Sequence, residues 1–130
     1  MKYRIYLDDC RTPAEKSWII VRTYQKFVEK INEIGLQNID LISLDHDLDD
    51  SAMKELINGG DIINYNNIKE KTGMDAAKFL VNLSMDTNIP LPQIYVHSFN
   101  PTGSENIISY INNYLRVCGL KETCIHVYNY

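Results

Sequence analysis

Residues 39–48 read Ile-Asp-Leu-Ile-Ser-Leu-Asp-His-Asp-Leu. The mostly apolar run over Ile39–Leu44 is typical of a buried strand. It ends abruptly in three titratable side chains, Asp45, His46 and Asp47. Such groups are costly to bury in an apolar core, whereas ligands of open α/β sheets bind just outside the carboxyl ends of the strands. The stretch therefore predicts an α/β fold with a polar site at the carboxyl edge of its sheet.

The same pattern occurs at two other apolar runs. The run over Tyr3–Leu7 is followed by Asp8 and Asp9. Residues 94–96, Ile-Tyr-Val, are followed by His97 and Ser98. Three predicted strands thus end in acids, histidines or a hydroxyl group, so we expect these groups to share one site.

Apolar periodicity and turn residues predict an alternation of strands and helices. The expected strands cover 2–7, 18–22, 40–44, 93–97 and 124–128. The expected helices run from the cap at Thr23 to Gly35, over 74–83, and from about 104 to 117. This order predicts a doubly wound, three-layer fold: a parallel five-stranded sheet of order 2-1-3-4-5 with helices on both faces. In that order the first and third strands flank the switch point, which brings Asp8, Asp9, Asp45 and Asp47 together, with His97 beside Asp45.

The segment from about 49 to 72 fits this alternation least well. It contains Gly59-Gly60 and a polar stretch, and no strong apolar period beyond a short helix near 52–57. A loop of this length in a small domain is either a functional excursion or a misassigned element. We interpret residues 1–130 as a single domain with an inserted loop or lid at about 49–72.

Composition narrows the possible partners. The chain has 130 residues, of which 45% are hydrophobic and 23% charged, values that suit one soluble domain. Its net charge of −4 argues against duplex DNA as a partner, but a small nucleotide or an RNA terminus stays possible. No apolar run reaches the length of a membrane span, and the start lacks a signal-peptide core, so we expect a cytoplasmic protein. The oligomeric state is not indicated.

Four carboxylates at one edge repel one another and need positive charge nearby. Oxygen ligands at this density suit Mg²⁺ or Mn²⁺, and Asp8, Asp9 and Asp45 are the expected ligands. The structural alternative is that Asp8 or Asp9 caps a turn. For His46 and His97, acid–base catalysis competes with a purely structural role.

Residues 98–106 combine a turn with a helix start. Free backbone N–H groups there can bind a phosphate, with Gly103 allowing close approach and with Ser98, Ser104 and Asn106 as hydrogen-bond donors. The alternative is a capping box with Thr102 or Ser104 as the N-cap. Arg11 and Arg22 flank the same edge, where one of them is expected to pair with the acids or to clamp a phosphate. The alternative for either is an ordinary surface side chain.

Several motifs together resemble a known family, the cyclic-phosphate processing receiver domains. They are Leu7-Asp8-Asp9-x-Arg11-x-Pro13, then Trp18 with Val21-Arg22-Thr23, Ser43-Leu44-Asp45-His46-Asp47-Leu48, Thr72-Gly73-Met74-Asp75, and His97-Ser98-x-Asn100-Pro101-x-Gly103-x-x-Asn106. The resemblance covers about residues 3 to 111. It implies a receiver-like, flavodoxin-like fold and an activity on cyclic phosphates of nucleotides or RNA ends.

The resemblance also implies roles for single residues. Asp8 and Asp9 match the receiver acid pair that holds a divalent metal, and Asp45 matches the phospho-accepting position. Ser98 matches the receiver hydroxyl position, while His46, Asp47 and His97 are additions of this family. Signalling receivers carry a lysine at the end of the fifth strand, where this chain has Tyr-Asn-Tyr at 128–130, which argues against a phosphorelay.

Our leading hypothesis is a metal-assisted phosphodiesterase. One of His46 and His97 activates water and the other protonates the leaving oxygen, Asp47 orients a histidine, and the loop from Asn100 to Asn106 holds the phosphate. Two alternatives stay open: a module that binds a nucleotide or cyclic nucleotide without cleaving it, and a degenerate receiver that acts through a protein partner.

Overall fold

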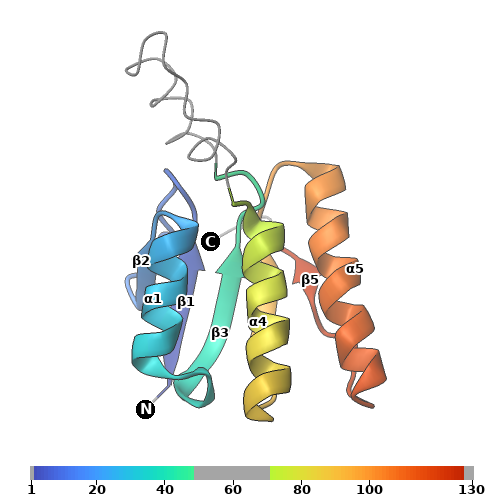
Figure 1. Ribbon diagram of the computed structural model, residues 1–130. Helices are drawn as coiled ribbons and strands as arrows, with labels where there is room; N and C mark the ends of the chain where they lie inside the picture. Colours follow the sequence, from blue (N-terminus) through green and yellow to red (C-terminus); the bar gives the residue numbers. More distant parts are fainter. Residues whose placement is uncertain (1, 49–70, 128–130) are drawn as a thin grey trace, which may run out of the picture.

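The computed structural model describes residues 2–48 and 71–127. Within these ranges five strands form one parallel sheet in the order β2-β1-β3-β4-β5 (Figure 1). The strands are β1 (Tyr3–Leu7), β2 (Trp18–Val21), β3 (Ile39–Leu44), β4 (Gln93–Val96) and β5 (Ile125–His126). The helices are α1 (Tyr24–Ile34), α4 (Gly73–Thr87) and α5 (Pro101–Val117), with a short 3-10 helix η1 (Leu36–Asn38). The predicted receiver-like, flavodoxin-like fold class and strand order are confirmed.

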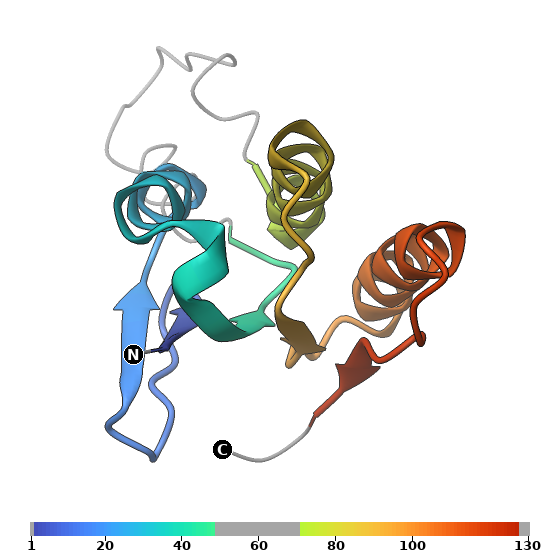
Figure 2. The same cartoon turned by 90° about the horizontal axis from the view of Figure 1, so that it is seen from below.

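The helical layers differ from the expectation. All three helices of the described residues lie on the same face of the sheet (Figures 1 and 2), so the predicted helices on the second face are not found in these ranges. The reason is the handedness of the connections. The steps β2→β3, β3→β4 and β4→β5 all run in one direction across the sheet, and right-handed crossovers then place every helix on one side. The step β1→β2 runs the other way, and a loop makes it instead of a helix.

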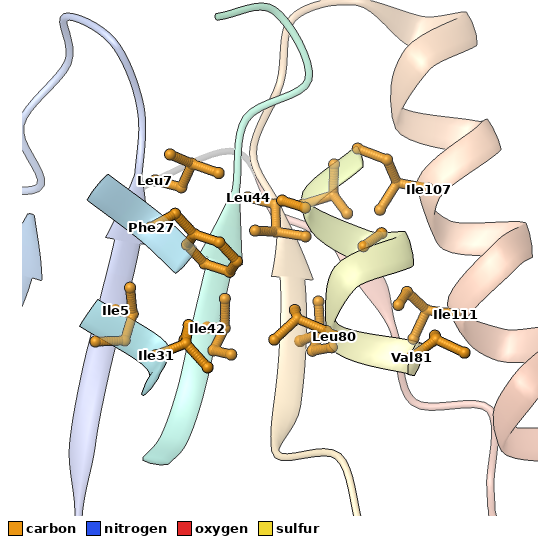
Figure 3. Packing of buried hydrophobic residues seen from close by; sticks show 14 of the residues in the cluster. Ile5, Leu7, Phe27, Ile31, Ile42, Leu44, Leu80, Val81, Ile107 and Ile111 are labelled. Atoms are coloured by element: carbon orange, nitrogen blue, oxygen red, sulfur yellow. The ribbon is translucent and has the colours of Figure 1, made fainter. Parts of the chain in front are cut away.

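The hydrophobic core lies between this helical layer and the sheet (Figure 3). Side chains alternate between the two faces of a strand, and in the three central strands the helix-facing positions are aliphatic and buried. They are Ile5 and Leu7 of β1, Ile42 and Leu44 of β3, and Ile94 and Val96 of β4. The opposite positions of the same strands include Tyr6 and Ser43, which are also buried. The packed core thus fixes the strands β1, β3 and β4, which are each followed by polar residues.

Local sequence explains where the helices begin and end. Thr23 caps α1 as predicted, because its side chain accepts a hydrogen bond from the backbone of Lys26. Thr72 and Asp75 form a capping box at the start of α4. The helix α5 starts earlier than expected, with Asn100 as its N-cap in place of Thr102 or Ser104, since Pro101 suits the first helical position.

The predicted insertion at 49–72 falls mostly on residues 49–70, which lie outside the described residues. In the part of the chain that is described, no helix is both long and apolar enough to cross a membrane.

Candidate functional site

Parallel pairing brings the carboxyl ends of β1, β3 and β4 side by side. The amide of Asp45 donates a hydrogen bond to the carbonyl of Leu7 at 3.0 Å, and the amide of His97 donates to the carbonyl of Leu44 at 3.0 Å. Asp8 directly follows Leu7, so the three polar side chains leave the sheet at one edge. The spatial arrangement inferred from the strand order therefore exists for these three residues.

Asp8 is the centre of this cluster and is fully buried. Its Oδ1 accepts hydrogen bonds from the backbone N–H groups of Cys10 at 2.9 Å and Arg11 at 2.8 Å. Its Oδ2 accepts from Arg11 Nε at 2.9 Å and contacts His97 Nε2 at 3.0 Å. Each carboxylate oxygen has two partners, which is its ordinary capacity. Asp8 thus ties the loop after β1 to the end of β4.

His97 is held on both ring nitrogens. Its Nε2 faces Asp8, its Nδ1 lies 2.7 Å from Ser43 Oγ, and its ring stacks on Tyr6 with centroids 4.3 Å apart and planes 8° from parallel. A neutral imidazole can donate from Nε2 and accept from the serine hydroxyl at Nδ1. His97 follows the strand next to that of Asp45, as expected, and its charge acts on Asp45. Its ring nitrogens contact Asp8 and Ser43, and this geometry suits a positioning role.

Arg11 links the two acids. Besides the bond from Nε to Asp8, its Nη2 lies 3.3 Å from Asp45 Oδ1. Its guanidinium stacks 4.4 Å from the ring centroid of Phe99, a side chain that is 80% exposed. The Nη1 group makes no hydrogen bond with another described residue, so it is available to an anion.

The environments of the two carboxyl groups move their pKa values apart. Burial opposes ionisation of Asp8, but hydrogen bonds from His97 and the backbone outweigh it and hold the pKa of this carboxyl well below its usual range. Burial and the negative charge of Asp8 raise the pKa of Asp45, and Arg11 offsets only part of this rise. Burial, followed by the charge of Asp8, raises the pKa of Tyr6 to about 12. Divergent acids of this kind occur at catalytic sites, where one stays ionised and the other carries a proton.

The raised pKa of Asp45 predicts a pH dependence of stability. Above pH about 4 the unfolded chain releases this proton, while the folded chain retains it until the pH passes the raised value. Stability is therefore lost as pH rises through this window, and Asp45→Asn should remove the loss. We expect the variant to gain stability relative to wild type between pH 4 and 7 in urea unfolding. Asp8 does not confound the comparison, because its lowered pKa acts only below about pH 4. A relative loss for the variant over this range would show that the folded chain favours the ionised carboxylate.

His46 and Asp47 form a second unit at the same edge. The Nδ1 of His46 lies 2.8 Å from Asp47 Oδ1, and that carboxylate also accepts from Asn100 Nδ2 at 3.3 Å. The His46 ring packs so closely on Gly103 that a Cβ there would lie 2.4 Å from its Cγ. Its Nε2 makes no hydrogen bond with residues 2–48 or 71–127. An imidazole oriented by a carboxylate with its other nitrogen available can transfer protons.

Most hydrogen-bonding groups at the start of α5 are paired with neighbouring residues of the same segment. Asn100 Oδ1 accepts from the backbone of Gly103 at 2.9 Å, and the amide of Ser104 donates to the carbonyl of Asn100 at 2.8 Å. Ser98 and Ser104 are buried, and their hydroxyl groups accept from the amide of Asn100 and donate to the carbonyl of Ser98, respectively. Asn106 is exposed, and its side chain makes no hydrogen bond with another described residue. The segment thus positions Asp47 and His46. Binding of a phosphate by its amide and hydroxyl groups stays a prediction.

Arg22 holds the loop that carries Arg11. Its Nη1 donates to the carbonyl groups of Asp8 and Arg11, and its Nη2 donates to Thr12 Oγ1 at 2.9 Å. These three acceptors lie on the short connection after β1. In this arrangement Arg22 supports the loop, and its predicted contact with a phosphate is not tested.

A known protein family matches most of the chain. The family described as "Cyclic-phosphate processing Receiver domain" matches residues 3–113. The chain belongs to this family. No curated protein and no solved structure matches it.

The acid pair of receivers suggests a divalent metal. We therefore asked whether the side chains of this cyclic-phosphate processing receiver domain have free ligand atoms for one. Asp8, Asp9 and Cys10 each offer one ligand atom, and these atoms lie within 4.8 Å of one another. The oxygens of Asp8 already have four hydrogen-bond partners, and Arg11 lies between Asp8 and Asp45. A metal ligated by Asp8 would have to displace Arg11 or His97, so this arrangement does not fit it. The metal at Asp8, Asp9 and Asp45 stays a prediction.

Sequence reasoning missed several parts of this receiver domain's site. Ser43 was counted as a strand residue, although alternation places it on the face of Tyr6 and opposite the helices. Gly73 was noted only as part of a family motif and without a role, yet a Cβ there would lie 1.9 Å from the carbonyl oxygen of Asp45. Phe99 was also missed, and it lines a pocket of about 340 Å³ together with Pro101, Glu105, Ile108 and His126. Phe99 lies only two residues after His97 in the sequence, and this proximity could have marked it as a residue near the site.

Proposed function

We propose that this domain binds a cyclic phosphate of a nucleotide or an RNA end at the carboxyl edge of its sheet and opens it with water. The observation that carries the proposal is the pairing of His46 with Asp47 beside the Asp8–Arg11–Asp45 cluster. The His46–Asp47 pair supplies an oriented proton acceptor. The Asp8–Arg11–Asp45 cluster supplies the positive charge of Arg11 and a buried acid. Membership in a family named for cyclic-phosphate processing supports the same substrate class.

The reaction needs two proton transfers. Water attacks phosphorus as His46 Nε2 takes its proton, with Asp47 stabilising the imidazolium that forms. One P–O bond of the ring breaks, and the leaving ribose oxygen takes a proton. Asp45 suits this donor role, because its raised pKa favours the protonated carboxyl. The free Nη1 of Arg11 faces no competing acceptor among the described residues and can stabilise charge on the phosphoryl oxygens.

The pocket beside Phe99 supports a nucleoside as the remainder of the substrate. Phe99 is its aromatic wall, Pro101 and Ile108 add apolar surface, and Glu105 and His126 add polar groups. The ring of Phe99 also contacts Arg11, so the candidate base site and the candidate phosphate donor share one side chain. Planar bases bind well on exposed aromatic rings.

The direct experiment is turnover of 2′,3′-cyclic nucleotides and of an RNA oligonucleotide ending in a 2′,3′-cyclic phosphate. We expect ring opening to a phosphomonoester, detected by phosphorus NMR. The His46→Gln variant should lose about 10²-fold or more in kcat, whereas Arg116→Ala, which changes an exposed ion pair far along α5, should retain wild-type activity. Recovery of every substrate intact from the wild type would overturn the enzymatic proposal. Tight binding in that case would establish the non-catalytic module.

A further inference from the structure

We infer that Arg11 is the resident cation of this site, and that the domain neither binds nor needs a divalent metal between Asp8 and Asp45. The inference goes beyond the proposed reaction and does not depend on it. Its basis is that one guanidinium contacts both acids, through Nε to Asp8 at 2.9 Å and through Nη2 to Asp45 at 3.3 Å. Asp8 and Asp45 are two of the three residues expected to hold a divalent metal.

Asp8 has no acceptor position left for a metal. Two backbone amides occupy its Oδ1, and Arg11 Nε and His97 Nε2 occupy its Oδ2. The distances of 2.8–3.0 Å are those of good hydrogen bonds. Because these donors satisfy a fully buried carboxylate, a metal ligand there would leave at least one donor without its partner, at a cost comparable to the lost bond.

Arg11 is built into the site and is not a loose surface side chain. Its own amide bonds Asp8 Oδ1, its carbonyl accepts from Arg22, and its guanidinium stacks on Phe99. The charges of Asp8 and Asp45 raise its own pKa further, although burial opposes this rise. A planar guanidinium held by Asp8, Asp45 and Phe99 suits two carboxyl groups better than a hydrated ion does.

Removing the guanidinium should therefore convert the site into one that accepts a metal. In Arg11→Gln the ionised Asp8 and the carboxyl group of Asp45 lose their shared cation, which favours binding of another cation there. Oxygen atoms then become available that suit Mg²⁺ or Mn²⁺. The variant should gain metal binding that the wild type lacks, which is an outcome that ordinary destabilisation does not produce.

The test is thermal unfolding of wild type, Arg11→Gln and the matched control Arg116→Gln, each in EDTA, in MgCl₂ and in MnCl₂. Arg116 pairs with exposed Glu122, so its variant controls for the loss of a surface arginine. We expect wild type and control to keep the same Tm in all three solutions. Arg11→Gln should have a lower Tm in EDTA, and MnCl₂ should raise it by about 3 °C or more in a saturable way.

Titration of wild type with MnCl₂, followed by the electron paramagnetic resonance signal of free Mn²⁺, is a second readout. Its expected result, no saturable binding by wild type, requires no variant. Saturable Mn²⁺ binding by wild type that Asp8→Asn abolishes would overturn the inference. A wild-type Tm that rises with Mg²⁺ or Mn²⁺ and not in the Asp8→Asn variant would overturn it as well. Neither readout uses a cyclic phosphate, so failure of this inference and failure of the proposed reaction are distinguishable.

Discussion

Asp8→Ala is expected to lower the free energy of unfolding by about 3–5 kcal/mol, the range for breaking a buried ion pair by removing one partner. The carboxylate is fully buried and joins four donors from three residues, Cys10, Arg11 and His97. Without it, the amides lose their acceptor, and among residues 2–48 and 71–127 Arg11 keeps only Asp45 as an acidic partner. The loss should therefore exceed that of an ordinary surface substitution several-fold.

Urea unfolding of Asp8→Ala beside Glu122→Ala measures this difference. Glu122 pairs with Arg116 in an exposed bridge, and its loss should change stability little, since exposed ion pairs contribute little. A third variant, Asp8→Asn, retains the side-chain shape and one acceptor oxygen but not the charge. Its free energy of unfolding should lie between those of wild type and Asp8→Ala. If Asp8→Ala were as stable as the Glu122 variant, the cluster would not hold the loop to the sheet.

The pH at which this stabilisation disappears is a linked expectation. The pKa of Asp8 lies below its usual range, so its contribution is complete above pH about 4 and is lost as pH falls through the lowered value. The difference in unfolding free energy between wild type and Asp8→Asn should thus be constant from pH 5 to 7 and shrink in acid. A difference that shrinks already between pH 7 and 5 would contradict the lowered pKa.

The position of the polar residues was predictable from the sequence, as was an arginine that pairs with the acids, but the individual hydrogen bonds were not. Apolar runs that end in Asp8, Asp45 and His97 place these groups at strand ends, and parallel pairing then has to bring neighbouring ends together. Which group bonds which depends on the loop after β1. There Arg11 turns back so that its Nε meets Asp8 Oδ2 three residues earlier, a geometry that no apolar periodicity encodes.

The helical layers were mispredicted for a related reason. Alternating strands and helices imply helices on both faces only if some crossovers run in each direction along the sheet. Here the β1→β2 connection is the one that reverses direction, and it holds Arg11 and Thr12 in a loop instead of a helix. The same residues that remove a helix from the second face supply the guanidinium of the site. The family resemblance identified the motif, but only coordinates show that this loop carries the cation.

Gly73→Ala is the second substitution with a large expected effect. It should lower the free energy of unfolding by about 3 kcal/mol. A Cβ at Gly73 would lie 1.9 Å from the carbonyl oxygen of Asp45 and 2.9 Å from the Cα of His46. Those atoms are backbone, and the Gly73 amide is bonded to the His46 carbonyl at 2.8 Å, so α4 and the end of β3 must separate. Overpacking of this kind costs about 1–3 kcal/mol and occasionally more. This exceeds the gain of at most about 1 kcal/mol that alanine offers over glycine in a helix.

Gly103→Ala provides the contrast that makes this prediction specific. Its Cβ would lie 2.4 Å from the His46 ring, but a side chain can rotate away where a backbone cannot. We therefore expect a smaller stability loss, about 1 kcal/mol, combined with separation of His46 from Asp47, visible as changed chemical shifts of the His46 ring in NMR spectra. Gly119→Ala controls for glycine replacement alone, because no atom lies within 4 Å of its Cβ and only its φ of 76° is strained. If Gly73→Ala cost no more than Gly119→Ala in urea unfolding, the close approach of α4 to the Asp45–His46 backbone would be wrong, and with it the fixed placement of both catalytic candidates.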